Sequence, residues 1–143
     1  MTRLTADGGK GDYLAVPGRL DGGKALGSPF LKMDGRAVFR EAVESLSAQA
    51  EAVLREARVA ATDIDLYVPH QANVRIMDAV ASRIGVNPAS VVKTVFQHGN
   101  TCAASVPLAL DYAVKNGMTR RGDTVLLQGV GAGMTCGSVL LIL

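Results

Sequence analysis

Short apolar runs that suit β-strands alternate along this chain with longer segments whose apolar residues recur at helical spacing. The strand-like runs are 62–69, 91–96, 124–128 and 136–143, and the helical segments are 36–58, 73–84 and 101–115. This order predicts an α/β fold in which helices cover a mostly parallel sheet. Because a short glycine-rich turn, 129–133, joins the last two strands, we expect these two to pair antiparallel.

The composition fits one compact soluble domain. Of 143 residues, 48% are hydrophobic and 20% are charged, which is enough to bury a single core. The net charge of +2 comes from basic residues interleaved with acidic ones, which argues against a nucleic-acid-binding surface. No run approaches the ~18 consecutive apolar residues of a membrane-spanning helix, so no membrane association is expected. The two cysteines indicate a reduced protein of the cytoplasm rather than a disulfide scaffold.

The first 30 residues differ from the rest. Glycines recur through residues 1–29, and the only strand candidate there is 13–16, so this lead-in should run over the surface while residues 31–143 form the core. An irregular stretch of this length is normally anchored on both sides by the elements it connects. It therefore hints at a preceding amino-terminal part.

Three segments should meet at one edge of the sheet, because ligands of open α/β sheets bind beyond the carboxyl ends of the strands. His70 follows the run that ends at Pro69, Asn100 follows the run 91–96, and the glycine-rich turn follows the run 124–128. An imidazole and a carboxamide placed there could both donate to the oxygen of one thioester and stabilise an enolate. The alternatives are a histidine satisfied by local backbone groups and an asparagine that caps a helix.

Two other patterns are less informative. The glycine run 129–133 lacks the spacing of a dinucleotide-binding loop and precedes a strand, so it either presents backbone N–H groups to a carbonyl or forms a simple hairpin. His98 and Cys102 are four residues apart but have no partner cluster, so no metal site is expected. Cys102 could be a nucleophile at a helix start, although its alanine-rich surroundings favour a small buried thiol.

Taken together, the motifs resemble the second half of the β-ketoacyl-acyl carrier protein synthase III family, within the thiolase-like superfamily. The residues that carry the resemblance are 31–39, 68–76, 98–110, and 129–133 with Thr135 and Gly137. The resemblance covers the chain from its glycine-rich lead-in to its last strand. It implies half of a thiolase-like α/β/α sandwich with a five-stranded mixed sheet.

The resemblance also implies an activity, namely decarboxylative condensation of acyl-coenzyme A with malonyl-acyl carrier protein to start fatty-acid chains, without a cofactor. It assigns enolate stabilisation to His70 and Asn100 and the oxyanion site to the backbone of Gly131 and Ala132. The residues it assigns to the pantetheine tunnel are Gly35, Phe39, Ala72 and Asn73. Those it assigns to carrier-protein binding are Gln71, Ala72, Asn73, Val74 and Arg75, with Arg40 and Arg83 as basic helpers.

Departures from the family pattern leave other functions open. Cys102, Val130 and Cys136 stand where the family usually has serine, phenylalanine and tryptophan, so the acyl preference is in question. The nucleophilic cysteine of the family belongs to an amino-terminal half, which would have to be supplied in cis or in trans, and the intact enzyme would be a homodimer. We therefore expect no acyl transfer by this chain alone. The alternatives are a non-catalytic partner subunit, a carrier-protein-binding module, and a relative that makes polyketide or quinolone products.

Overall fold

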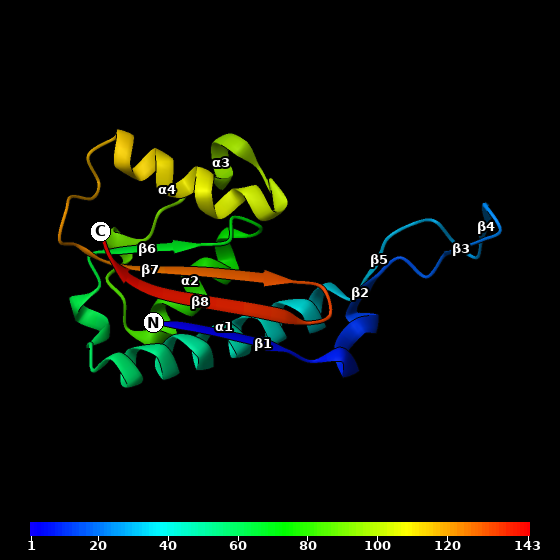
Figure 1. Ribbon diagram of the computed structural model, residues 1–143, viewed down its shortest axis with the longest axis horizontal. Helices are drawn as coiled ribbons and strands as arrows, with labels where there is room; N and C mark the ends of the chain where they lie inside the picture. Colours follow the sequence, from blue (N-terminus) through cyan, green and yellow to red (C-terminus); the bar gives the residue numbers. More distant parts are fainter.

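The computed structural model describes all 143 residues and has three layers, with a four-stranded sheet between two groups of helices (Figure 1). Helices α1 and α2 cover one face of the sheet, and α4 with the short α3 covers the other. The bounds of the helices are α1 Gly35–Ala57, α2 Val74–Ile84, α3 Val95–His98 and α4 Ser105–Lys115. The strands of the sheet are β1 Thr2–Ala6, β6 Leu66–Pro69, β7 Thr124–Gly131 and β8 Thr135–Ile142.

The sheet has the order β1-β8-β7-β6, and only its β6–β7 pair is parallel. The prediction of a mixed sheet is confirmed, but the predicted fifth strand and the mostly parallel pairing are wrong. Residues 91–96 make a single bridge, Val91 to Tyr67, and then turn into α3. The edge strand β1 was not predicted, because its residues are exposed throughout and show no alternation of apolar and polar side chains.

The two faces of the sheet bury separate apolar clusters, and alternate residues of each strand supply them. Tyr67 of β6 and Leu126 of β7 face the cluster that α1 and α2 cover. Leu66, Val68 and Val125 face the smaller cluster under α4. All four residues of β6 are therefore buried, and the strand holds its carboxyl end, where His70 follows, in a fixed position.

Polar side chains under α1 also tie this helix to the sheet. Gln128 accepts a hydrogen bond from the Tyr67 hydroxyl at 2.7 Å and donates to Ser138 Oγ at 2.7 Å and to the Leu46 carbonyl at 2.9 Å. Ser138 Oγ in turn donates to Gln49 of α1 at 3.1 Å. Because these side chains are buried, each hydrogen bond fixes the register of helix against strand. Burial also raises the pKa of Tyr67, so its hydroxyl stays a donor.

Helix α1 begins and ends where its caps require. The Asp34 carboxylate accepts hydrogen bonds from the backbone N–H groups of Arg36 and Ala37 at 3.1 and 3.0 Å. Arg58 ends the helix in the left-handed conformation, with φ of 57°. The predicted helix 36–58 is thus confirmed with a shift of one residue at each end.

We expect Asp34→Ala to lower the free energy of unfolding by about 1 kcal/mol, because two N–H groups of the first helical turn lose their acceptor. Chemical denaturation would measure the change. Asp12→Ala is the matched control, since the exposed Asp12 makes no side-chain hydrogen bond or ion pair, and it should change stability by less than about 0.5 kcal/mol. Equal effects of the two substitutions would contradict the assignment of Asp34 as the cap.

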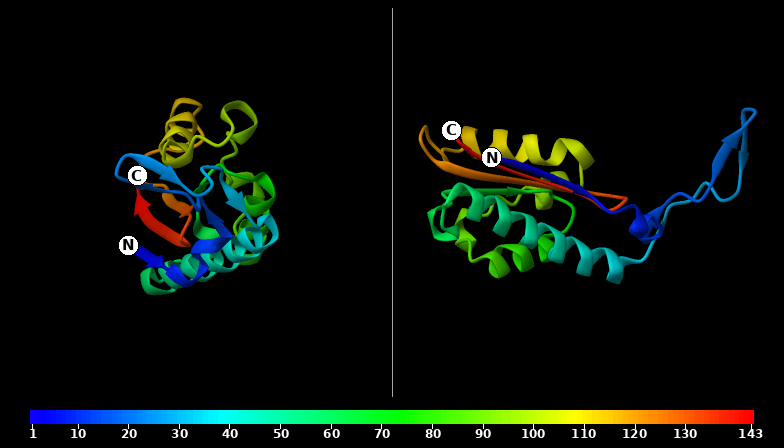
Figure 2. Two further views of the ribbon diagram at one scale, coloured as in Figure 1. Left: turned by 90° about the vertical axis from the view of Figure 1, so that its right-hand side faces the viewer. Right: turned by 60° about the horizontal axis from the view of Figure 1, so that its bottom comes forward.

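The glycine-rich lead-in forms an arm that projects from the body (Figures 1 and 2). At its tip β3 (Arg19–Asp21) and β4 (Lys24–Leu26) pair around Gly22 and Gly23, whose φ values of +52° and +80° suit glycine. At its base β2 (Leu14–Ala15) pairs with β5 (Lys32–Met33), which returns the chain to α1. Strand β2 falls within the strand candidate 13–16, whereas β1, which belongs to the main sheet, was not predicted in the surface lead-in 1–29.

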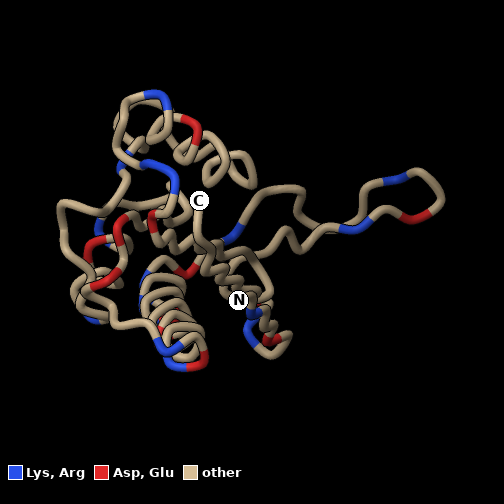
Figure 3. Tube along the Cα trace, turned by 60° about the vertical axis from the view of Figure 1, so that its left-hand side comes forward, with Lys and Arg blue, Asp and Glu red and all other residues tan.

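Charged residues of both signs are scattered over the trace (Figure 3), in line with the small net charge of +2. None of the helices combines the length and the apolar character that crossing a membrane would require.

Candidate active site

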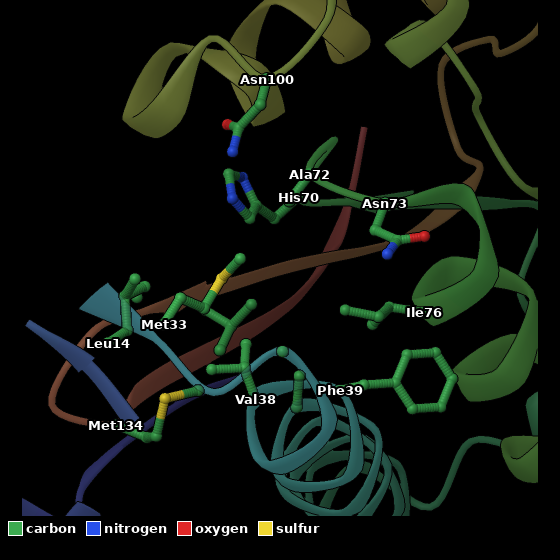
Figure 4. Close-up of a pocket in the computed structure, with 14 residues that line it drawn as sticks. Leu14, Met33, Val38, Phe39, His70, Ala72, Asn73, Ile76, Asn100 and Met134 are labelled. Atoms are coloured by element: carbon green, nitrogen blue, oxygen red, sulfur yellow. The ribbon is translucent and has the colours of Figure 1, made fainter. Parts of the chain in front are cut away.

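A cavity of about 310 Å³ opens at the carboxyl ends of β6 and β7, bordered by α1 and by the base of the arm (Figure 4). Its wall is mostly apolar, and its polar side chains are His70, Asn73 and Asn100. The other lining residues are Leu14, Met33, Gly35, Val38, Phe39, Ala42, Ala72, Ile76, Val130, Gly131 and Met134. An apolar cleft with a few polar groups is the usual form of a small-molecule site.

His70 is held at the sheet edge from two sides. Its backbone N–H donates to the Gln128 carbonyl at 2.8 Å, which continues the pairing of β6 with β7. Its ring nitrogen Nδ1 lies 2.6 Å from Ser105 Oγ, at the first residue of α4. No other hydrogen bond of the ring is present, so Nε2 is the nitrogen without a protein partner. Burial lowers the pKa of His70 below its ordinary 6.5, and the ring is therefore neutral at pH 7.

The Asn100 carboxamide is also fixed in orientation. Its Oδ1 accepts a hydrogen bond from the backbone N–H of Cys102 at 2.9 Å, so the amide nitrogen is the end left free. Figure 4 shows this nitrogen directed toward the His70 ring. The alternative in which Asn100 caps the long helix does not hold, because α4 begins five residues later and has no side-chain cap.

A second cavity, of about 380 Å³, lies beside the first and shares with it the residues Leu14, His70, Asn100, Val130 and Gly131. Cys102 lines this second cavity and is exposed, so the expectation of a small buried thiol is wrong for it. The physical reason is a turn of 3-10 helix, Cys102–Ala104, in which Cys102 takes a φ of 53° outside α4. Cys136 is the buried cysteine, and burial raises the pKa of its thiol.

The four residues predicted for a pantetheine tunnel, Gly35, Phe39, Ala72 and Asn73, all line the first cavity with His70 and Asn100. Of the two predicted oxyanion residues, Gly131 lines both cavities, whereas Ala132 lies in the turn beyond them and lines neither. Asn73 also caps α2, because its Oδ1 accepts the Arg75 N–H at 2.9 Å. The structure therefore brings most of this predicted set together.

The prediction that Gln71 binds a carrier protein is wrong. Its side chain is 1% exposed and makes four hydrogen bonds to backbone groups, so it is not available to a carrier protein. Of the other residues predicted for that role, Arg75 and Ala72 are exposed and Val74 is half-buried. The Arg75 guanidinium lies over the Phe39 ring, 5.8 Å from its centroid, where a cation is attracted to the aromatic face.

Arg40 and Arg83 are exposed as well, but they lie on different elements. Arg40 follows Phe39 on α1, whereas Arg83 is in the last turn of α2, eight residues from Arg75 and hence about 12 Å along the helix. Of the three arginines, Arg75 contacts the cavity-lining Phe39 and Arg40 follows Phe39 in the sequence, whereas Arg83 lies at the far end of α2.

Several residues that line or support the site were not predicted from the sequence. Leu14, Met33 and Met134 line the first cavity from short strands and turns, where no periodicity marks an inward side chain. Ser105 was missed although its position gave a signal, since it is a polar residue in the apolar segment that follows Asn100. No group of three or more His, Cys, Asp or Glu side chains could hold a metal ion.

The lowered pKa of His70 predicts how stability depends on pH. Between pH 6.5 and the lower pKa of the folded state, the unfolded chain binds more protons, so the free energy of unfolding should fall as the pH drops below 6.5. The carboxylates with lowered pKa values, Asp7, Glu41 and Asp123, have ordinary values at or below 4.5 and are largely ionised in both states above about pH 5.5, so His70 accounts for most of the loss between there and pH 6.5.

Denaturant unfolding at several pH values between about 5.5 and 6.5 would measure this effect. His70→Gln should flatten this pH dependence. A slope that survives His70→Gln would show that another group titrates.

Comparison with known proteins gives a consistent result. Residues 54–143 match the family model described as 3-oxoacyl-[acyl-carrier-protein] synthase III C terminal. The structure is similar to 3-oxoacyl-(acyl carrier protein) synthase III from Pseudomonas aeruginosa, with 39% identity and a TM-score of 0.89 over 99% of this chain. The Thermus thermophilus synthase III gives 40% identity and a TM-score of 0.87 over 99% of the chain.

A priming β-ketosynthase of the R1128 polyketide pathway gives 35% identity and a TM-score of 0.88, again over 99% of this chain. The fold is thus thiolase-like. The chain spans 43% of the length of the Pseudomonas structure, 45% of the Thermus structure and 44% of the polyketide enzyme.

Proposed function

Because this chain belongs to the family of 3-oxoacyl-[acyl-carrier-protein] synthase III carboxy-terminal domains, we propose that it supplies the part of a condensing active site that decarboxylates a malonyl thioester. The observation that carries the proposal is the joint presence of His70 and Asn100 in the walls of the same two cavities. Each has one polar end held by the protein and a nitrogen left free.

The chemistry follows from where charge develops. When the malonyl carboxylate leaves as carbon dioxide, the electron pair of the broken carbon–carbon bond moves onto the thioester and forms an enolate. Two N–H donors aimed at the thioester oxygen stabilise that charge more than they stabilise the neutral carbonyl, which lowers the barrier. The enolate carbon then attacks an acyl group held as a thioester on a cysteine, a new carbon–carbon bond forms, the acyl–sulfur bond breaks, and the cysteine thiolate leaves.

The substrate side of the proposal rests on the first cavity. A pantetheine arm is long and largely uncharged, and a mostly apolar cleft bordered by Gly35, Phe39 and Ala72 suits it. Carrier proteins are acidic, so the exposed Arg40, Arg75 and Arg83 would attract one to the cavity mouth. Coenzyme A thioesters, which carry the same arm, are the proposed acyl donors.

We also propose that the nucleophilic cysteine of the complete reaction comes from a polypeptide segment outside residues 1–143. Cys136 is 2% exposed and packs in the larger apolar cluster. Cys102 replaces the serine common at this place in the family, and its backbone N–H holds the Asn100 carboxamide. Condensation would then need a second segment, whereas decarboxylation uses groups that this chain carries.

Both cysteines are free, which suits a reducing compartment such as the cytoplasm.

Initiation of fatty-acid synthesis is the pathway we propose, because the 3-oxoacyl-(acyl carrier protein) synthases reach 39% and 40% identity. The second candidate is the priming step of polyketide synthesis, which the 35% identity to the R1128 priming enzyme favours. The two use the same chemistry and differ in the carrier protein and acyl group. Rates measured with carrier proteins of the two pathways would separate them.

The direct test is to incubate the purified chain with malonyl-carrier protein and to measure release of carbon dioxide and formation of acetyl-carrier protein. The same assay with the Pseudomonas enzyme's remaining segment added, plus acyl-coenzyme A, tests whether condensation needs a separate nucleophile. Decarboxylation in either mixture that depends on His70 would support the proposal. No decarboxylation in both mixtures, with carrier protein still bound, would favour the non-catalytic binding module instead.

A further inference from the structure

We propose that the Ser105 hydroxyl is a positioning group that places the ring proton of His70 on Nε2, so that a neutral imidazole presents an N–H to the cavity. Its catalytic meaning rests on the proposed function, but the tautomer is a property of this chain that can be measured without any substrate. The inference follows from the hydrogen bonds around a single oxygen atom.

Ser105 Oγ has two neighbours within hydrogen-bond distance. His70 Nδ1 lies at 2.6 Å, and the backbone N–H of Gln71 donates to Oγ at 3.2 Å. Ser105 is 1% exposed, so no solvent reaches it in place of these partners. Because a backbone N–H can only donate, the Gln71 contact occupies a lone pair of the hydroxyl and leaves its proton for another acceptor.

The only acceptor in reach of that proton is Nδ1 of His70. If Nδ1 carried the ring proton instead, Oγ would accept two hydrogen bonds and the hydroxyl proton would be buried without a partner. Leaving a buried donor unpaired is unfavourable enough to bias the equilibrium about tenfold or more. The hydroxyl therefore donates to Nδ1, and the ring proton lies on Nε2.

This arrangement matters because only a protonated ring nitrogen can donate to a thioester oxygen. A neutral imidazole in an unconstrained site exchanges between two tautomers, and one of them presents a lone pair where a donor is needed. Figure 4 places the Asn100 amide nitrogen, itself a donor, on the same side of the cavity as the imidazole. With the proton on Nε2, the two residues present donors together.

Ser105 is held in place from two sides, by the helical layer that contains α4 and by the end of the sheet that carries His70. It begins α4, and its N–H donates to the Cys102 carbonyl at the end of the turn that also holds Asn100. On the sheet side, Gln71 is fixed by its four side-chain hydrogen bonds, which sets the direction of its own N–H. One serine thus relates the helix that follows Asn100 to the strand end that carries His70.

The test is long-range proton–nitrogen NMR of the nitrogen-15-labelled chain at neutral pH, because protonated and unprotonated ring nitrogens resonate far apart. The chain has two histidines, so a His98→Gln background leaves His70 as the only imidazole. We expect Nε2 to be protonated in about 90% of molecules or more. A spectrum dominated by a protonated Nδ1 would overturn the inference, whatever any variant does.

The variants separate positioning from a merely structural role. Ser105→Ala should raise the Nδ1-protonated fraction several-fold, whereas Ser105→Thr, which keeps the hydroxyl, should retain the wild-type spectrum. Ser82→Ala, at an exposed position on α2, is the control and should change nothing. If Ser105→Ala folds and leaves the tautomer fraction unchanged, the serine does not set it.

The decarboxylation assay adds the catalytic consequence. Ser105→Ala should lower kcat by about tenfold with little change in KM, and Ser105→Thr should restore it. The two proposals fail in different ways. If the chain decarboxylates while His70 is protonated on Nδ1, the proposed role of Ser105 is wrong but the proposed function stands. If His70 is protonated on Nε2 but the chain never decarboxylates, the proposed function is wrong but the role of Ser105 in setting the tautomer stands.

Discussion

His70→Ala and Asn100→Ala are each expected to slow decarboxylation of malonyl-carrier protein by about 10²–10³-fold, the usual loss when one oxyanion donor is removed. The fall should be in kcat rather than in KM, because the donors act on charge that is present only in the transition state. Since both donors would contact the same oxygen, the double variant should lose less than the product of the two factors.

The control for this experiment is His98→Ala. His98 ends the short helix α3, is exposed, and lines neither cavity, so its removal should change the rate by less than about twofold. Carbon dioxide release, measured with saturating and with limiting malonyl-carrier protein, separates kcat from KM. A His70→Ala variant as active as His98→Ala would exclude His70 from the reaction.

The largest expected effect on stability belongs to Gln71. Its carboxamide oxygen accepts from Thr94 N–H at 2.8 Å and Val95 N–H at 3.1 Å, and its nitrogen donates to the carbonyls of Pro69 and Val92 at 2.7 and 3.0 Å. Gln71→Leu conserves much of the volume but leaves these four backbone groups without partners in a buried place. We expect a loss of about 4 kcal/mol in the free energy of unfolding.

Denaturant titration of Gln71→Leu would measure this loss as a shift of the unfolding midpoint. The matched substitution is Gln97→Leu on α3, where the glutamine is exposed and makes no side-chain hydrogen bond, so stability should change by less than about 0.5 kcal/mol. Equal midpoints for the two variants would mean that the loop 91–98 does not depend on the buried carboxamide.

The same glutamine explains why one strand was predicted wrongly. Val91 to Phe96 is β-branched and apolar, and nothing in its own sequence argues against a strand. In the folded chain, the N–H groups of Thr94 and Val95 bind Gln71 rather than a neighbouring strand, and the chain turns into α3. Such a side-chain contact across more than twenty residues leaves no local pattern in the sequence.

The elements and residues that were predicted correctly either have a long periodic pattern of apolar residues or directly follow an apolar run in the sequence. Helices α1 and α2 follow from the helical spacing of their apolar residues. His70 and Asn100 could be found because each follows the end of an apolar run, which is where the fold class places a site. At the base of the arm, β2 falls within the strand candidate 13–16, but its partner β5 has only two residues and could not be predicted.

The shared wall of the two cavities has a consequence for ligand discovery. His70 and Asn100 line both cavities, together with Leu14, Val130 and Gly131. A fragment in one cavity that accepts a hydrogen bond from the His70 imidazole therefore occupies the N–H that a fragment in the other cavity would need. We expect compounds found for the two cavities to compete for binding, so that saturating one weakens the apparent affinity of the other.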